Sequence, residues 1–265
     1  MEKRTVSINN QIISYKTAGD GDAVILLHGF GEDSSVWQQQ LEYLKTKYYV
    51  ITPDIPGSGN SGLTDDVSME AIADVIKNIA EAEKLDKLVL LGHSMGGYAT
   101  LAFAEKYPQQ LKAFGLIHST ATADTEEKKA VRRKGIEFIK KHGAKTFLDM
   151  QPGNLFAKET LEHNQPLVNE FKNSYPDFSP TALIEYYEAM IARPDRTAVL
   201  KDSKVPVLFI LGEQDNVIPL NSVLSQTALP AETDVQILKK SGHMGMLEEP
   251  EATNHIIENF LADLS

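Results

Sequence analysis

No cysteine occurs among the 265 residues of this chain, and tryptophan occurs only once. The absence of cysteine excludes disulfide bonds, thiolate metal sites, iron–sulfur clusters and a cysteine nucleophile. Basic residues are outnumbered: 26 Lys and Arg stand against 37 Asp and Glu, which gives a net charge of −11. Because a phosphate backbone is bound by clustered basic side chains, this balance argues against a nucleic-acid partner.

Long apolar runs are also absent. The longest ones, such as residues 23–27, are far shorter than the roughly 20 apolar residues that span a bilayer. The first residues contain no apolar stretch of the kind found in a secretory signal. We therefore expect a cytoplasmic protein without a membrane partner. The hydrophobic fraction of 42% is ordinary for a globular chain with a sizeable core.

Short apolar segments recur along the chain. Two alternating segments at the start, 5–9 and 12–18, predict a β-hairpin. The later segments are apolar nearly throughout, as in parallel strands covered on both faces, and they lie at 23–27, 48–51, 87–91, 111–117, 205–211 and 235–238. Helical patterns lie between them, at 34–47, 68–83, 94–107 and 250–261. This order predicts an α/β fold: one mostly parallel eight-stranded sheet with helices on both faces and the hairpin at its antiparallel edge.

One long segment interrupts the alternation of strand and helix. Residues 120–200 contain no convincing strand pattern and several helical ones. The residues that recur at helical spacing in its first helix are Val131, Gly135, Phe138, Ile139 and His142. Ser179-Pro180 is typical of the start of a later helix. We predict a helical lid over 120–200, inserted after the sixth strand into a core of residues 1–119 and 201–265.

Gly92-His93-Ser94-Met95-Gly96 follows the predicted strand 87–91 and opens a helix rich in Ala and Leu. A serine on so sharp a turn between strand and helix needs small neighbours, and glycines flank it on both sides. Its hydroxyl is then exposed at the helix N-terminus, where the partial positive charge favours an alkoxide or an oxyanion. This context predicts that Ser94 is a nucleophile.

A serine hydroxyl needs a base that accepts its proton, and a third group that holds the base. Of the seven histidines, His243 is the best candidate, because it lies in a Gly-flanked loop directly after the last strand. His93 adjoins the nucleophile, and His28 belongs to the loop after the strand 23–27. His118, His142 and His163 lie before or in the lid, and His255 lies in the final helix.

The acid is expected between serine and histidine in chain order. Asp215 follows the predicted strand 205–211, so it lies at the same edge of the sheet as Ser94 and His243. Glu213 is a nearby competitor, whereas Asp202 and Asp195 precede the strand and lie at its other end.

The segment His28-Gly29-Phe30-Gly31 follows the predicted strand 23–27, again at this edge. A tetrahedral intermediate needs two backbone N–H donors, one from the residue after the nucleophile and one from this loop. We therefore expect the amides of Met95 and Phe30 to form the oxyanion hole. No second histidine or carboxylate stands at metal-ligand spacing from His28, so packing and hydrogen bonding are its expected roles.

These motifs together resemble the α/β-hydrolase superfamily over nearly the whole chain. The matching segments are His28 to Phe30, Asp54 to Ser61, Gly92 to Gly96, Gly212 to Asp215, and Gly242-His243. Within the superfamily the chain looks most like the small lidded esterases, enol-lactonases and carbon–carbon bond hydrolases. Serine at position 94 departs from haloalkane dehalogenases and epoxide hydrolases, which carry aspartate there. Asp54 and its neighbours are shared by relatives of many activities, which favours a structural turn.

The resulting hypothesis is a serine hydrolase, of the carboxylic ester hydrolase class, that cleaves a small ester, lactone or related acyl substrate through an acyl-enzyme. Ser94, His243 and Asp215 form its triad, Phe30 and Met95 its oxyanion hole, and it needs no metal or organic cofactor. Because His243 must be neutral to act as the base, we expect activity to fall below roughly pH 6–7. The oligomeric state stays open.

Two alternatives keep the same fold. One is a carbon–carbon bond hydrolase or a perhydrolase that uses the same triad, and the other is a ligand sensor with slow turnover. Lid aromatics are expected either to line an acyl pocket or to pack the lid on the core, and they are Phe138, Phe147, Phe156, Phe171, Tyr175, Phe178, Tyr186 and Tyr187. The single tryptophan, Trp37, is close in sequence to the predicted oxyanion loop and is a candidate for the pocket entrance.

Overall fold

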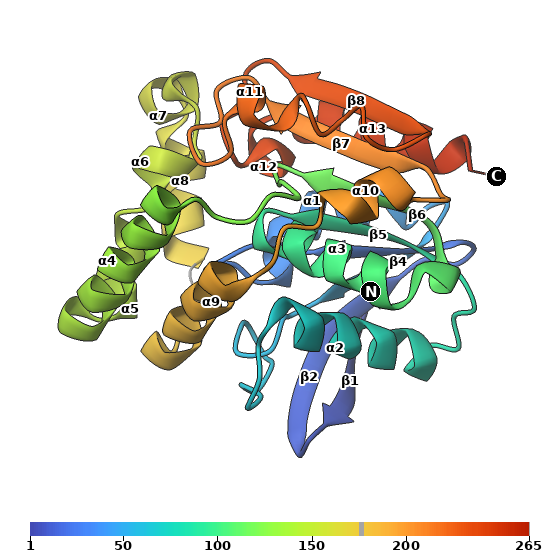
Figure 1. Cartoon of the computed structure of the whole chain (residues 1–265), viewed down its shortest axis with the longest axis horizontal. Helices are drawn as coiled ribbons and strands as arrows, with labels where there is room; N and C mark the ends of the chain where they lie inside the picture. The colour runs from blue at the N-terminus through green and yellow to red at the C-terminus, as the bar shows by residue number, and fades with distance from the viewer. Residues whose placement is uncertain (175–177, 265) are drawn as a thin grey trace.

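An eight-stranded sheet forms the centre of the computed structural model, which describes residues 1–174 and 178–264 (Figure 1). The strand order across the sheet is β1-β2-β4-β3-β5-β6-β7-β8. The strands are β1 Glu2–Ile8, β2 Gln11–Ala18, β3 Ala23–Leu27, β4 Tyr49–Pro53, β5 Leu88–His93, β6 Leu111–Ile117, β7 Val207–Gly212 and β8 Thr233–Leu238. Pairing is parallel from β4 to β8, and antiparallel pairs join β1 to β2 and β2 to β4 at one edge. The predicted sheet, with its hairpin edge, is confirmed.

The central strands are apolar throughout because helices cover both faces of the sheet. In β3, Ile25 and Leu27 belong to one core cluster, and Val24 and Leu26 belong to the other. The first cluster packs under α2 Met69–Ala82 and α3 Met95–Lys106, and the second under α1 Gln38–Leu44 and α13 Pro250–Ala262. Burial on both faces is what removes the polar half of the usual strand alternation.

Helix starts follow the sequence signals in part. The Ser68 hydroxyl accepts a hydrogen bond from the Ala71 amide at 3.2 Å and caps α2, as its sequence predicts. The predicted helix over 34–47 is instead broken: a 3₁₀ turn η1, Ser34–Trp37, precedes α1. The remaining short helices of the core are η2 Pro108–Gln110, α11 Leu220–Val223 and α12 Gly245–Glu248.

Between β6 and β7 the regular secondary structure of the described residues is entirely helical. Residues 120–200 are called the helical insertion. Its helices are α4 Glu126–His142, α5 Ala144–Asp149, α6 Pro152–Leu155, α7 Lys158–His163, α8 Gln165–Ser174, α9 Pro180–Ala192 and α10 Thr197–Asp202. Helices α4 to α9 lie together beside the sheet (Figure 1). Helix α10 extends past residue 200, the predicted end of the lid, and packs on α3. Tyr175, one of the aromatics singled out above, lies outside the described residues.

The face of α4 that packs inward differs from the predicted one. Ile136 and Ile139 are buried, while Val131 is 68% exposed and His142 is also exposed. The predicted stripe through Val131 and His142 is therefore wrong at both ends. Its register follows Ile136, because α4 packs along α9 and its other side meets solvent.

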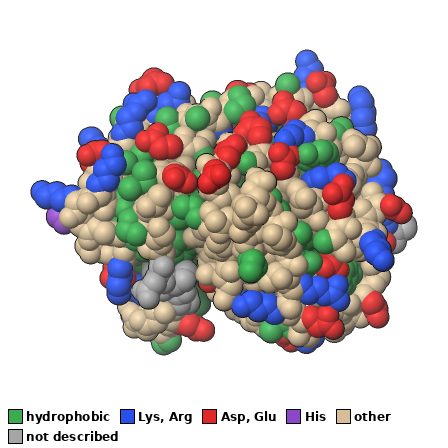
Figure 2. Space-filling view, turned by 90° about the horizontal axis from the view of Figure 1, so that it is seen from below, with side chains coloured by type: hydrophobic (Ala, Val, Ile, Leu, Met, Phe, Trp, Pro, Cys, Tyr) green, Lys and Arg blue, Asp and Glu red, His purple; other side chains and the backbone are tan. Residues whose placement is uncertain are grey.

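Charge is mixed on the molecular surface. Figure 2 shows acidic and basic side chains interspersed over one face, without a continuous basic patch on that face. Within residues 1–174 and 178–264, no helix has the length and apolarity needed to cross a membrane.

Candidate functional site

Ser94 lies on a strained turn between β5 and α3. Its backbone dihedrals are φ 49° and ψ −114°, a conformation that residues with a Cβ adopt only when the surroundings impose it. The Ser94 amide donates to the Ile117 carbonyl at 2.9 Å, which holds the turn against the end of β6. A Cβ on Gly96 would lie 2.6 Å from the His28 carbonyl oxygen, so glycine at this position allows the turn to press against the end of β3.

Parallel strands bring the other predicted residues to the same edge of the sheet. Asp215 follows β7 and His243 follows β8. The His243 Nδ1–H donates to Asp215 Oδ2 at 2.8 Å, and both side chains are at most 2% exposed. Glu213, the competitor for the acid position, is exposed, and Asp202 lies in α10 before β7. The structure thus joins Asp215, and neither Glu213 nor Asp202, to His243.

Asp215 is held as a carboxylate by donors on both oxygens. Oδ1 accepts from the amides of Val217 and Ile218, each at 2.8 Å. Burial acts to raise the pKa of Asp215, but the adjacent His243 and His118 rings outweigh it and hold that pKa well below its ordinary range. An ionised Asp215 accepts a hydrogen bond from the Nδ1–H of His243, which leaves Nε2 as the proton acceptor of the ring.

His118 is a member of the site that sequence reasoning set aside. It follows β6 with φ 48°, and its Nδ1 donates to Asp215 Oδ2 at 3.2 Å. Its Nε2 is buried and has no hydrogen-bond partner among the described residues. Burial lowers the pKa of His118 to about 4, so the ring is neutral at pH 7. The available signal was its position directly after a predicted strand, at the same edge as Ser94 and Asp215.

His118, Asp215 and His243 also form a group of side chains, found among the described residues, whose types and proximity would suit a metal ion. Their ligand-type atoms lie within 4.8 Å of one another. The two hydrogen bonds to Asp215 Oδ2 account for this close approach. The two Nδ1 atoms therefore already serve as hydrogen-bond donors to the carboxylate.

The loop after β3, residues 28–32, lies against the Ser94 turn and is called the β3 loop. A Cβ on Gly29 would be 3.2 Å from the Ser94 Cβ. Among the described residues, the amides of Phe30 and Met95 donate to no carbonyl of the turns, loops or caps. Two backbone donors beside Ser94 therefore have no carbonyl acceptor within these segments.

His28 fixes the β3 loop, and Asp54 fixes the start of η1 just beyond it. The Nδ1–H of His28 donates to the Gly29 carbonyl at 2.9 Å, and its Nε2 accepts from the Ile55 amide at 3.0 Å. Asp54 accepts from the amides of Ser34 and Asn60 at 3.0 and 2.9 Å. Both residues have the hydrogen-bonding roles expected from the sequence.

Aromatic side chains of the helical insertion cover Phe30 of the β3 loop. The Phe30 ring stacks on Tyr187 with centroids 4.3 Å apart, and its edge contacts are with Phe147 and Tyr186 at 6.2 and 6.4 Å. Phe138 packs on Phe147 behind them. These four aromatics of the insertion therefore form one cluster above the β3 loop.

The other aromatics of the insertion, and Trp37 of the core, lie away from this cluster. Phe156 packs edge-on against Phe171 in the second core cluster, and Phe178 is buried in the first. Trp37 is fully buried, and the centroid of its ring lies 6.4 Å from that of His93 in an edge-to-face arrangement. The interpretation of Trp37 as part of a pocket entrance is therefore wrong, because η1 turns its side chain into the core.

Polar contacts attach the insertion to the loop after β8, residues 241–245, called the β8 loop. The His243 amide donates to the Leu155 carbonyl at 2.6 Å. Glu248 accepts from the Ala157 amide and the Thr160 hydroxyl on one side, and from the Gly242 and Met244 amides on the other, at 2.7 to 3.3 Å. Burial raises the pKa of Glu248, and its hydrogen bonds offset only part of this effect.

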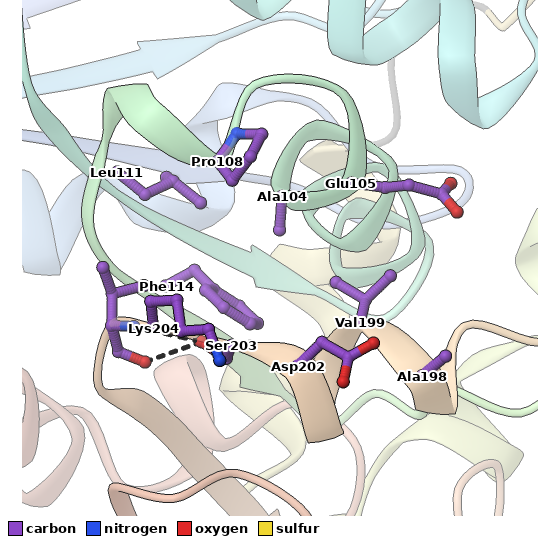
Figure 3. Close-up of a pocket in the computed structure, with 11 residues that line it drawn as sticks. Ala104, Glu105, Pro108, Leu111, Phe114, Ala198, Val199, Asp202, Ser203 and Lys204 are labelled. Carbon is purple, nitrogen blue, oxygen red and sulfur yellow. Dashed lines mark hydrogen bonds between the residues drawn. The ribbon is translucent and has the colours of Figure 1, made fainter.

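A separate groove lies at the opposite end of the sheet. It has a volume of about 310 Å³, and Figure 3 shows apolar side chains lining it, among them Leu111, Phe114 and Val199. Leu111 begins β6 and Val205 precedes β7, so the groove lies at the amino ends of these strands. Ser94 and Asp215 lie past the carboxyl ends of their strands, and the groove is therefore not part of their site.

Comparison with known proteins agrees with this architecture. A family model described as the alpha/beta hydrolase fold matches residues 22–250. The chain is 26% identical over 267 residues to 2-hydroxy-6-oxo-6-phenylhexa-2,4-dienoate hydrolase of Burkholderia cepacia, covering 97% of this chain and 93% of that protein.

Solved structures are similar over the full length. A thermophilic esterase of Thermogutta terrifontis has a TM-score of 0.93 and 26% identity, covering 100% of this chain and 99% of the esterase. The enol-lactonase of Burkholderia xenovorans LB400 has a TM-score of 0.90 and 19% identity, covering 98% of this chain and all of that one. With its sheet order, its strained Ser94 turn and a family match over most of its length, the chain belongs to the α/β-hydrolase family.

Proposed function

We propose that this hydrolase cleaves a small carboxylic ester, lactone or related acyl substrate, with Ser94 as nucleophile, His243 as base and Asp215 as the acid that orients it. The observation that carries the proposal is the strained Ser94 turn at the sheet edge where a 2.8 Å hydrogen bond joins His243 to Asp215. Each of the three residues comes from a different strand end, as in other serine hydrolases of this chain order.

The proposed reaction has two stages. Ser94 Oγ attacks the substrate carbonyl while His243 Nε2 takes its proton, and the Asp215 carboxylate stabilises the resulting imidazolium. The amides of Phe30 and Met95 stabilise the oxyanion, and the alcohol leaves with the proton from His243. His243 then takes a proton from the water that attacks the acyl carbonyl, and returns it to Ser94 Oγ as the bond between Ser94 and the acyl group breaks and the acid leaves.

The substrate is proposed to be a small acyl compound with an apolar part. Support comes from the aromatic cluster of the insertion, which stacks on Phe30 next to the proposed oxyanion donor. We propose that the insertion, residues 120–200, is the lid of the acyl pocket. Over residues 120–200 the 12 Lys and Arg side chains are balanced by 12 Asp and Glu side chains, so the net charge of the insertion favours no single charge on the substrate.

Labelling of Ser94 tests the nucleophile. A fluorophosphonate probe should label the wild-type protein and leave Ser94→Ala unlabelled. The variant should also lose at least about 10³-fold of the hydrolysis of p-nitrophenyl acetate, because the acyl-enzyme cannot form. A panel of esters with graded acyl chains then measures the length of the pocket. Full ester hydrolysis by Ser94→Ala would contradict the proposal.

A second candidate is carbon–carbon bond hydrolysis, which the similarity to the Burkholderia cepacia dienoate hydrolase favours. The same three residues are proposed to act in it. Parallel assays with p-nitrophenyl acetate and a vinylogous diketone of the ring-cleavage type separate the two. A kcat/KM at least about 100-fold higher for the diketone would transfer the assignment to the second candidate.

A further inference from the structure

His93 lies between the two loops that flank Ser94. Its Nδ1 is 3.1 Å from Glu32 Oε2 of the β3 loop, and its Nε2 is 2.8 Å from the His243 carbonyl oxygen of the β8 loop. The His93 side chain is fully buried, and that of Glu32 is 3% exposed. One ring therefore contacts both loops, below the surface of the site.

Both partners of His93 are hydrogen-bond acceptors. A backbone carbonyl only accepts, and Glu32 Oε2 already accepts from the Gly29 amide at 2.8 Å. Each nitrogen of the ring must consequently carry a hydrogen to complete its contact. The geometry thus describes a protonated imidazolium that pairs with a carboxylate, both buried.

The charges around His93 come from several elements. Glu32 faces it from the β3 loop and Asp215 acts on it from beyond β7, while the rings of His243 and His118 lie 4.9 and 6.0 Å away. Burial acts to lower the pKa of His93, but the Glu32 carboxylate and the two hydrogen bonds raise it above its ordinary value. Burial likewise acts against ionised Glu32, and His93 together with the Gly29 amide lowers the pKa of that carboxyl.

We propose that His93 and Glu32 are positioning residues that hold the β3 loop and the β8 loop at a fixed distance across Ser94. Glu32 fixes the β3 loop through the Gly29 amide, one residue before the proposed oxyanion donor Phe30. His93 fixes the β8 loop at the carbonyl of His243, the proposed base. The inference rests on the proposed function, because it is the spacing of donor and base that these contacts set.

The bridge is complete only within a window of pH. Its contribution is present above the lowered pKa of Glu32 and is lost as the pH rises through the raised pKa of His93, where one of the two ring donors disappears. Loss of the bridge at high pH gives the enzyme an alkaline limb of activity. That limb is distinct from the acidic limb expected from protonation of His243.

The protonation state of His93 is measured first, by NMR of the wild-type protein labelled with ¹⁵N. His93→Gln, which lacks the ring, assigns its signals. Two protonated ring nitrogens are expected at pH 7, where an ordinary histidine is mostly neutral. A neutral His93 ring at pH 7 would overturn the inference. This readout needs no substrate, so it stays informative if ester hydrolysis is absent and the proposed function fails.

The role in catalysis is tested by the pH profile of ester hydrolysis. In Glu32→Gln the alkaline limb of kcat/KM should move to lower pH by about one unit, because the amide no longer stabilises the imidazolium. The acidic limb should stay in place, and kcat should fall more than KM rises. Glu81→Gln, a matched change at an exposed position of α2, should keep the wild-type profile. An alkaline limb that coincides with wild type in a folded Glu32→Gln protein would refute the positioning role.

Discussion

The two buried histidines that flank His243 differ in what their ring nitrogens face. His93 has an acceptor at each nitrogen, the Glu32 carboxylate and the His243 carbonyl, and its pKa is raised. His118 has one acceptor, Asp215, and its other nitrogen has no partner among the described residues, while its pKa is lowered to about 4. Both rings are buried to the same degree. The charge of a buried histidine is therefore decided by its partners and not by burial alone.

The two histidines also serve different parts of the site. His93 contacts the β3 loop through Glu32, and the contacts of this loop with the insertion are aromatic and centre on Phe30. The His118 side reaches Asp215 and through it the β8 loop, whose contacts with the insertion are hydrogen bonds at Glu248 and Leu155. Aromatic packing tolerates small displacements, whereas these hydrogen bonds are directional, so we expect the β8 side to be the more rigid one.

The largest effect is expected when the Asp215 carboxylate, which accepts hydrogen bonds from both His118 and His243, is replaced. In Asp215→Asn the amide no longer fixes the tautomer of His243, and kcat should fall by roughly 10⁴-fold with little change in KM. Steady-state kinetics with p-nitrophenyl acetate measures this loss. Asp202→Asn, an exposed aspartate ahead of β7, is the matched control and should retain wild-type kcat. A loss of less than about tenfold would show that Asp215 does not orient the base.

The next effect isolates the neutral state of His118. Because the folded protein binds this proton only near pH 4 and the unfolded chain binds it near 6.5, stability is lost as the pH falls between these values. His118→Asn tolerates the positive φ and keeps an N–H near Asp215, so it should remove this loss. Between pH 7.5 and 5, the variant should gain about 2 kcal/mol relative to wild type in the free energy of unfolding.

Urea titrations at the two pH values measure that gain. The exposed His255 supplies the control, since His255→Asn should follow the wild-type dependence on pH. If the difference between His118→Asn and wild type is the same at pH 7.5 and pH 5, His118 is not held neutral by burial, and the contrast with His93 disappears.

The smallest effect concerns the attachment of the β8 loop to the insertion. In Glu248→Gln one carboxylate oxygen becomes an NH₂ group, so either the Ala157 and Thr160 donors or the Gly242 and Met244 amides lose their acceptor. The free energy of unfolding should fall by about 1–2 kcal/mol and kcat by about tenfold.

Two further variants sharpen this result. Thr160→Val deletes only one donor on the insertion and should have a smaller effect in the same direction. Glu251→Gln, at an exposed position at the start of α13, should change neither quantity. Wild-type kcat in Glu248→Gln would mean that the β8 loop keeps its geometry without the insertion.

The parts of the fold that the sequence predicts are those with a local signal. Strands β3, β5, β6 and β7 are apolar on both faces, and Ser68 marks the start of α2. Ser94 stands out because a strained turn between strand and helix needs glycines around it. His243 and Asp215 could be chosen because parallel strands end at the same edge, which is a property of the fold class.

Contacts between distant segments of the chain could not be predicted from local sequence patterns. Glu32 and His93 are 61 residues apart and meet only when β3 and β5 pair, and Asp215 meets His118 across 97 residues. The inward face of α4, with Val131 exposed, depends on how α9 lies against it. Trp37 gave no sign that η1 would bury it.

By itself the sequence determined the α/β sheet, the turn that carries Ser94 and the candidates for base and acid, because hydrophobic spacing and glycine placement act over a few residues. Only the tertiary structure decided the charges of the buried histidines and the attachment of each loop to the insertion. The reason is physical: a pKa and a hydrogen bond depend on the atoms that surround a group in space, and in this chain those atoms come from distant segments.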